Sequence, residues 1–189
     1  MTDRPVAAGK SSFDLIDRDK FFSQLKLTQN TVFLDLASGV GRYSLEVAKR
    51  LGANGEVHAV DLWAEGIEAL NETIREHHLT NIHTIIADIT KPLPLTDSFY
   101  DICLLATVFH DLAELDRKPL LQEVYRLLKP NGILAVVEFK KIDHGPGPPV
   151  HIRLSEQELE EQIVPHGFFR FSCDELGQYT YTCSFRKKT

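Results

Sequence analysis

Short runs of apolar residues alternate along the chain with longer segments in which apolar residues recur every three or four positions. The short runs predict strands, and the longer segments predict helices with one apolar face. Such alternation is typical of a parallel sheet with helices packed on both faces. The strands are expected at 31–36, 56–60, 83–87, 100–106 and 133–139, and the helices between them at 43–51, 64–77 and 115–128.

The last part of the chain follows a different pattern. Ser155 and Glu158 have the spacing of a capping box and predict the start of a helix that is closed by Gly167. The apolar runs 168–173 and 179–185 flank a glycine-containing turn and predict an antiparallel hairpin. The expected fold is therefore α/β, Rossmann-like and doubly wound, with a mostly parallel seven-stranded sheet and a C-terminal antiparallel hairpin.

The length of 189 residues is that of a single domain. We expect one unit over 1–189, with a helical segment at 1–26 that folds over the site as a lid. A ligand-binding core at 31–139 follows, and a C-terminal helix and hairpin occupy 155–189. The Pro- and Gly-rich stretch 145–149 is interpreted as a loop, because too little chain follows it to form a separate core.

The net charge of −6 indicates which partners the chain attracts. An acidic chain with scattered basic residues does not attract phosphate backbones, so we expect no nucleic-acid partner. The first ten residues lack the apolar core of a signal peptide, and no apolar run reaches the length of a membrane span. These observations predict a cytoplasmic protein without membrane contact, and they leave the oligomeric state open.

The three cysteines stand singly within apolar runs, without the paired spacing of a redox or metal motif. Cys103, Cys173 and Cys183 are therefore expected to be buried thiols in a reducing compartment. Cys173 and Cys183 can also face each other across the expected hairpin.

A Gly-x-Gly sequence lies at the joint between the first expected strand and its helix. Gly39 and Gly41 allow a tight turn and a close approach of a ligand to the backbone. Asp61 ends the second expected strand, where its carboxylate can accept both hydroxyls of a ribose. Each feature alone fits a simple turn or a helix cap, but the joint spacing predicts a nucleotide-type ligand.

Two further residues indicate which nucleotide this is. Dinucleotide sites need a third glycine at the position of Ser44, and they bring a pyrophosphate to the start of the helix. Asp35 lies at the end of the first expected strand, where its carboxylate repels a pyrophosphate. The same carboxylate suits a ligand that carries an ammonium and a sulfonium, which predicts S-adenosylmethionine as the cofactor.

The core resembles the class I S-adenosylmethionine-dependent methyltransferases. Segments similar to the family's motifs occur in family order at 34–41, 57–61, 85–89, 100–112 and 127–134. The likeness is closest to the small-molecule branch related to ubiquinone- and menaquinone-biosynthesis methyltransferases. One departure is Ala37, which stands in place of the family's first glycine and is expected to require a negative φ.

The resemblance implies roles for individual residues. Asp35 would hold the methionine ammonium, Asp61 the ribose and Asp88 the adenine amino group. Leu62 would pack on the adenine ring, and the loop amides would hold the methionine end. The remaining residues expected in the cofactor site are Ala37, Ser38, Gly39, Gly41, Ile89, Leu105 and Ala106.

His110 is the candidate general base, because it follows the fourth expected strand at the end of the sheet where ligands bind. Asp111 is expected to orient the ring or to cap the following turn. The alternative is that His110 is a polar loop residue that only shapes the pocket. The acceptor pocket is expected to contain Phe13, Phe109, His110 and Lys140. No trio of histidines has the spacing of metal ligands, so no metal is expected.

These inferences predict methyl transfer from S-adenosylmethionine to a small-molecule acceptor by in-line displacement. Three alternatives stay open: a non-enzymatic S-adenosylmethionine-binding module, a methyltransferase that acts on protein or nucleic acid, and a nicotinamide dehydrogenase. Ser44 and Asp35 count against the last of these.

Overall fold

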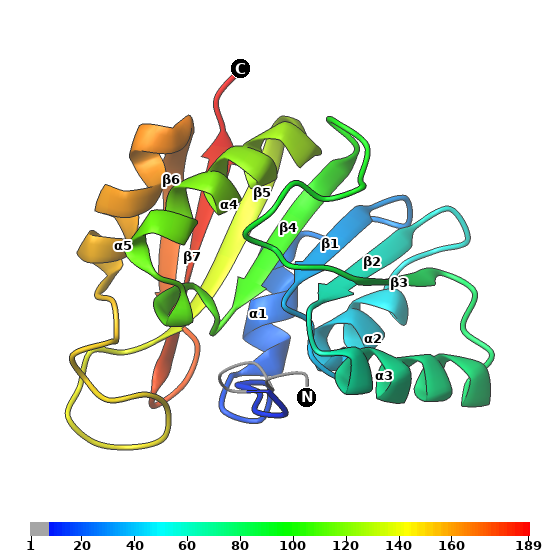
Figure 1. The fold of residues 1–189 in the computed structure, drawn as a ribbon, viewed down its shortest axis with the longest axis horizontal. Helices are drawn as coiled ribbons and strands as arrows, with labels where there is room; N and C mark the ends of the chain where they lie inside the picture. The colour runs from blue at the N-terminus through cyan, green and yellow to red at the C-terminus, as the bar shows by residue number, and fades with distance from the viewer. Residues whose placement is uncertain (1–7) are drawn as a thin grey trace.

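The computed structural model describes residues 8–189 and contains one sheet in the order β3-β2-β1-β4-β5-β7-β6 (Figure 1). Neighbouring strands from β3 to β5 are parallel, and β7 runs antiparallel to both β5 and β6. The expected mostly parallel, seven-stranded sheet with a C-terminal antiparallel hairpin is confirmed. The strands are β1 Val32–Leu36, β2 Glu56–Asp61, β3 Ile82–Ile86, β4 Tyr100–Ala106, β5 Leu128–Phe139, β6 Phe168–Glu175 and β7 Thr180–Lys187.

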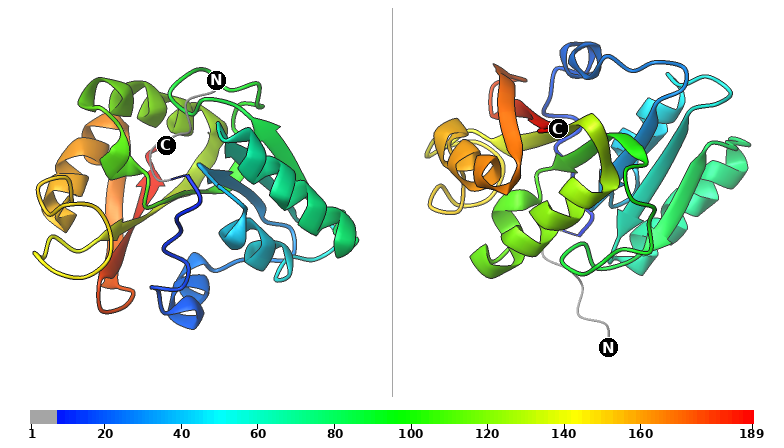
Figure 2. Two further views of the ribbon diagram at one scale, coloured as in Figure 1. Left: turned by 60° about the horizontal axis from the view of Figure 1, so that its bottom comes forward. Right: turned by 90° about the horizontal axis from the view of Figure 1, so that it is seen from above.

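Helices cover both faces of the sheet, as Figures 1 and 2 show. The side chains of α4 and α5 join one apolar core, whereas those of α1 and α2 join a second core on the opposite face. The helices are α1 Arg18–Leu25, α2 Arg42–Ala48, α3 Ala64–Glu76, α4 Glu114–Leu127 and α5 Glu156–Ile163, with short 3-10 turns η1 Phe109–Asp111 and η2 Val164–His166. No helix in the described part of the chain is long and apolar enough to cross a membrane.

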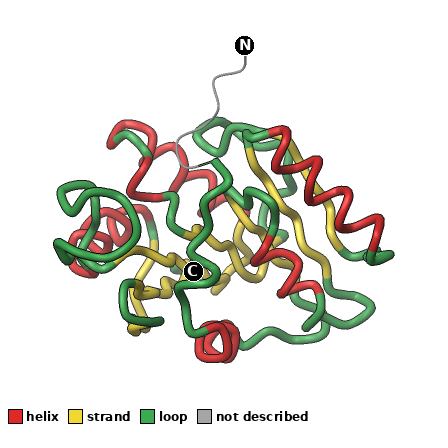
Figure 3. Tube along the Cα trace, turned by 90° about the horizontal axis from the view of Figure 1, so that it is seen from below, coloured by secondary structure: helices red, strands yellow, loops and turns green. Residues whose placement is uncertain are grey.

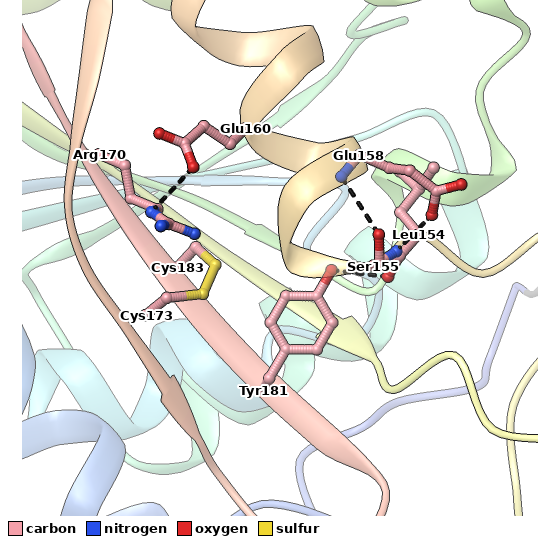
Figure 4. The surroundings of a disulfide bond; sticks show 8 residues. All are labelled: Leu154, Ser155, Glu158, Glu160, Arg170, Cys173, Tyr181 and Cys183. Carbon is pink, nitrogen blue, oxygen red and sulfur yellow. Dashed lines mark hydrogen bonds and ion pairs between the residues drawn. A yellow bond between two sulfur atoms is a disulfide. The ribbon is translucent and has the colours of Figure 1, made fainter.

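The expected capping box at the start of α5 is present. The Ser155 hydroxyl accepts from the Glu158 amide at 3.2 Å, and the Glu158 carboxylate accepts from the Ser155 amide at 2.8 Å. The buried Tyr181 hydroxyl donates to the carbonyl of Leu154 next to this cap (Figure 4). These contacts join α5 to the hairpin and fix the end of the long connection that leaves β5.

Strand β5 begins earlier than the sequence pattern predicts. The Lys-Pro-Asn-Gly sequence at 129–132, which is typical of a turn, does not separate α4 from the strand, because β5 starts at Leu128 and already pairs with Tyr100. The register then shifts between Tyr100 and Ile102, and Asn131 takes a left-handed φ of 63°. The turn residues therefore form an irregularity within the strand.

The hairpin contains a cross-strand disulfide. Cys173 on β6 and Cys183 on β7 are direct register partners, and their sulfurs are bonded (Figure 4). Their expected juxtaposition is confirmed, but the interpretation of these two residues as thiols is wrong. Cys103 is a free and buried cysteine, as expected.

Two irregular segments meet at the carboxyl ends of the parallel strands. The segment before α1 crosses this end of the sheet, as the left view of Figure 2 and the view from below in Figure 3 show. The connection 140–154 curls beside the same end after β5 (Figure 1). This end of a parallel sheet is where ligands of such folds bind.

Candidate functional site

The turn after β1 is built from three left-handed positions. The φ angles are 61° at Ala37, 57° at Gly39 and 71° at Gly41. The expectation of a negative φ at Ala37 is therefore wrong. The turn has to lead the chain from β1 into α2 while the Ser38 amide bonds to the Val60 carbonyl at 3.1 Å. An alanine in this conformation costs about 1–2 kcal/mol, so the turn holds local strain.

The two glycines serve different purposes. A Cβ on Gly39 would meet no atom within 4 Å, so this position faces open space in which a ligand can approach the backbone. A Cβ on Gly41 would lie 2.5 Å from the Leu70 side chain, so glycine is needed there for the packing of α3. Gly41 also donates to the Ser38 carbonyl at 2.9 Å and precedes the first residue of α2. Gly39 therefore belongs to the site surface and Gly41 to its support.

Asp61 connects the turn to the second strand. One carboxylate oxygen accepts from the Gly39 amide and the other from the Trp63 amide, both at 2.7 Å. Asp61 therefore braces the start of α3, as a capping residue would, and it also lines a cavity. Asp88 does the same, since it accepts from the amide and hydroxyl of Thr90 while lining this cavity.

The turn cavity, as we name the hollow beside Gly39, Asp61 and Asp88, has a volume of about 280 Å³. Leu62 lines it and is 54% exposed, so an apolar surface is presented to any flat ligand that enters. Trp63 lines the same wall. The residues expected to bind the cofactor that lie on this cavity are Ala37, Gly39, Asp61, Leu62, Asp88, Ile89 and Ala106.

Asp35 lines an adjoining cavity of about 270 Å³, which also includes Ser38 and shares Ala37, Gly39 and Ala106 with the turn cavity. The Asp35 carboxylate accepts from the Ser44 hydroxyl at 2.6 Å. Burial raises the pKa of Asp35 to about 7, aided by the nearby negative charge of Asp61 and opposed by the Ser44 hydrogen bond. The Ser38 hydroxyl is buried without a hydrogen-bond partner. A cationic ligand with an acceptor group would therefore satisfy both residues.

A third cavity, of about 490 Å³, lies beside the loop 146–149 and is named the proline-loop cavity. Its apolar wall includes Leu15, Phe139 and Ile152, and its polar side includes His110 and Asp111. Lys10, Thr107 and Asp111 line both this cavity and the turn cavity, so the two hollows adjoin. Its size is in the range of small-molecule sites.

His110 is buried in the wall of the proline-loop cavity and is bound to Glu138 from β5. The Glu138 carboxylate lies 2.5 Å from Nδ1 of His110 and also accepts from the His110 amide at 3.2 Å. Burial lowers the pKa of His110, but the hydrogen bond and charge of Glu138 outweigh it, so the pKa lies above the ordinary 6.5. With Nδ1–H directed to Glu138, Nε2 carries the lone pair that can accept a proton, and it lies 3.5 Å from Oδ1 of Asp111.

Thr107 is strained where the two cavities adjoin. This β-branched residue has a φ of 53°, a conformation such side chains rarely adopt. Its amide donates to the Val137 carbonyl at 2.8 Å, and its hydroxyl donates to Ser12 at 3.2 Å. Strain of this kind concentrates at functional sites. Thr107 thus ties the segment before α1 to the end of β4.

Arg153 holds the loop that forms the far wall of the proline-loop cavity. The residue is only 4% exposed, and its guanidinium donates hydrogen bonds to main-chain carbonyls. The distances run from 2.8 to 3.4 Å. The carbonyls belong to Lys140, Ile142, His144, Pro146 and Pro148. One side chain therefore sets the path of the whole loop.

Besides Gly41, four expected site residues lie away from the cavities. Leu105 and Phe109 are fully buried in the core on the α4 face, because strand alternation and the η1 turn direct them away from the cavities. Phe13 packs edge-on against Tyr43 in the other core, 5.1 Å between ring centroids. Lys140 pairs with Glu175 at 3.0 Å. In place of Phe13, its neighbours Lys10, Ser11 and Ser12 line the proline-loop cavity.

Comparisons with known proteins agree with this geometry. The methyltransferase domain family matches residues 27–170. Demethylmenaquinone methyltransferase of Lactobacillus johnsonii is 30% identical over 121 residues, which are 64% of this chain and 49% of that protein. The 2-phytyl-1,4-naphtoquinone methyltransferase of Nostoc sp. is 29% identical over 152 residues, which are 78% of this chain and 61% of that protein.

A solved structure is also similar over nearly the whole chain. The crystal structure of a SAM dependent methyltransferase from Aquifex aeolicus has a TM-score of 0.85 and 27% identity, and covers 96% of this chain and 95% of that one. By contrast, this chain spans about half the length of the curated demethylmenaquinone methyltransferase that it matches.

Proposed function

Because the chain belongs to the family of S-adenosylmethionine-dependent methyltransferase domains, we propose that it transfers a methyl group from S-adenosylmethionine to an apolar small-molecule acceptor. The observation that carries the proposal is the buried His110–Glu138 pair, whose histidine lines the proline-loop cavity next to the turn cavity. A methyl acceptor and a methyl donor in these two hollows would meet beside this pair.

The residues of the turn cavity and of the adjoining cavity lined by Asp35 fit S-adenosylmethionine. Asp35 offers a buried carboxylate for the ammonium, and the unpartnered Ser38 hydroxyl offers a hydrogen bond to the methionine end. Asp61 keeps free lone pairs for the ribose hydroxyls. Leu62 offers an exposed apolar face for the adenine ring. S-adenosylmethionine would supply an activated methyl carbon whose bond to sulfur breaks as the acceptor attacks.

The acceptor is proposed to occupy the proline-loop cavity. Much of its lining is apolar, and its polar residues Lys10, Thr107 and Asp111 also line the turn cavity. An acceptor with an apolar body and a single reacting polar group fits this distribution. The names of the two curated relatives, which refer to a menaquinone precursor and a naphthoquinone, support an acceptor of this chemical type.

His110 is proposed to take a proton from the acceptor. The X–H proton of the acceptor passes to Nε2 of His110, and the electron pair left on X forms the new bond to the methyl carbon. Glu138 fixes the ring orientation through Nδ1 and stabilises the imidazolium that forms. The cavities position the reactants and exclude water, which supplies much of the rate when the leaving group is already activated.

The proposal is tested by measuring S-adenosylhomocysteine release over a panel of apolar phenols, hydroquinones and amines. We expect turnover with at least one class, and we expect His110→Ala to slow it by about 10²–10⁴-fold, the range of general-base catalysis. Binding of S-adenosylmethionine, measured by calorimetry, should be unchanged in this variant. Asp61→Ala should instead weaken that binding, because it removes the proposed ribose partner.

Three outcomes would contradict parts of the proposal. Binding of NAD in place of S-adenosylmethionine would remove the methyltransferase assignment. Donor binding without turnover on any acceptor would favour a non-enzymatic module. Full activity of His110→Ala would make this residue a structural element of the pocket wall.

A further inference from the structure

Three side chains lie together at one end of β2, and the site described above lies at the other end. Glu56 is the first residue of β2, and Asp61, which lines the turn cavity, is the last. Glu56 and His58 are two residues apart and therefore lie on the same face of the sheet. His83 on β3 is the direct register partner of His58. The pairing of β2 with β3 thus brings the imidazole of His83 beside the carboxylate and imidazole that β2 supplies.

The distances within this cluster fit an ion better than hydrogen bonds. Nε2 of His58 and Nε2 of His83 each lie 3.4 Å from the same oxygen, Oε2 of Glu56. Good N–H···O hydrogen bonds are about 2.7–3.2 Å long. Ligand atoms about 2.0–2.1 Å from a tetrahedral ion lie about 3.3–3.4 Å from one another. The three candidate ligand atoms lie within 4.8 Å of one another.

A neighbouring residue holds one imidazole in the orientation that a metal ligand needs. The Tyr100 hydroxyl lies 2.6 Å from Nδ1 of His58. When Nδ1–H donates to the tyrosine oxygen, the Nε2 lone pair points toward Glu56 and His83. Metal-ligating histidines usually have such a partner on the other ring nitrogen. Tyr100 itself is fully buried, so this support is rigid.

The cluster is also accessible from solvent. The connection from β3 to β4 contains no helix, as Figure 1 shows, so this end of the β2–β3 face is not covered by one. The His83 side chain is 52% exposed and that of Glu56 is 32% exposed. An ion can therefore enter and keep water in a fourth coordination position.

We propose that Glu56, His58 and His83 form a binding site for a divalent transition-metal ion. The two-imidazole, one-carboxylate ligand set suits Zn²⁺, with Co²⁺ as a spectroscopic substitute. Residue spacing along the chain predicts no metal site, because it does not reveal the register that pairs His58 with His83. This site is separate from the proposed methyl-transfer site and does not depend on it.

The test uses the tag-free, metal-free chain titrated with Zn²⁺ by calorimetry and with Co²⁺ by absorbance. We expect one ion per chain, d–d bands typical of tetrahedral Co²⁺, and a rise in melting temperature with Zn²⁺. His83→Ala should weaken Zn²⁺ binding by more than about tenfold, the scale seen even for loss of an outer-shell partner. Glu56→Gln, which keeps the side-chain shape, should weaken it as well.

His77→Ala is the matched control, since His77 is exposed and lies just before β3 without belonging to the cluster. This variant should bind Zn²⁺ as the unaltered chain does. Equal affinities for the unaltered chain and His83→Ala would overturn the proposal, as would the absence of saturable binding. Because His83 is exposed, its removal should leave the melting temperature of the metal-free chain unchanged, which separates a binding defect from a folding defect.

Discussion

Asp35→Asn tests whether the ionisable carboxyl of Asp35, in the cavity proposed to hold the methyl donor, lowers the stability of the ligand-free chain. The side chain is fully buried, and it accepts a hydrogen bond from Ser44 that the amide oxygen of asparagine can also accept. The substitution therefore removes the ionisable group while keeping shape and hydrogen bonding. We expect the variant to be more stable than the unaltered chain above pH 7 in the absence of ligand.

The size of the effect follows from the pKa of Asp35, which burial raises to about 7. The unfolded chain has an ordinary Asp pKa of about 3.9, so the two states differ by about three pKa units, or about 4 kcal/mol. Between these two values the folded state binds more protons than the unfolded state. The stability contribution of the protonated carboxyl is therefore present below pH 4 and is lost as the pH rises to 7.

Urea denaturation of the ligand-free chain at pH 5 and at pH 8 measures this difference. The stability gain of Asp35→Asn should be about 1.5 kcal/mol at pH 5, one pH unit above the unfolded pKa, and should grow by about 1.4 kcal/mol for each further pH unit up to 7. Asp143→Asn, the same change on an exposed loop residue, should alter stability by no more than about 0.5 kcal/mol at either pH. A destabilised Asp35→Asn variant at pH 8, or a gain that does not change with pH, would refute the reasoning.

Three further changes test other parts of the site. Glu138→Gln removes the charge that raises the pKa of His110; the rise of activity with pH should move to lower pH and the maximal rate should fall, and an unmoved pH profile would show that Glu138 does not act through His110. Ala37→Gly relieves the left-handed alanine and should stabilise the chain by about 0.5–1 kcal/mol in urea denaturation; a loss of stability would mean that the turn is not strained. Arg153→Lys leaves carbonyls without donors, so it should cost about 2 kcal/mol or more and speed amide exchange in 140–149, and unchanged exchange would show that the loop holds its own shape.

The fold and the donor side of the site were predictable because their signals are local. Strand and helix positions follow from apolar spacing within a dozen residues. Gly39 and Asp61 were found from their places at the ends of successive strands, and parallel strands bring such ends together. The position of the turn cavity is thus a direct consequence of the alternating pattern.

The rest of the site depends on contacts that chain spacing does not reveal. Glu138 lies 28 residues after His110, and only the pairing of β4 with β5 brings the two together. Leu105 and Ala106 are adjacent on β4, but strand alternation sends the first into the core and the second to the cavity. Sequence alone does not decide which of the two neighbours faces the ligand.

Arg153 has a consequence for how acceptor choice can change over evolutionary time. Its hydrogen bonds to the loop are made to main-chain oxygens, which every amino acid supplies. Side chains between 140 and 149 can therefore be exchanged without losing the bonds that hold the loop in place, except at Gly145 and Gly147, whose φ angles of 86° and 105° favour glycine. In homologues that keep this arginine, single substitutions in the loop can change the lining of the proline-loop cavity. The carboxylates of Asp35, Asp61 and Asp88 need not change at the same time. Divergence of acceptor preference is accordingly expected to accumulate in this loop first.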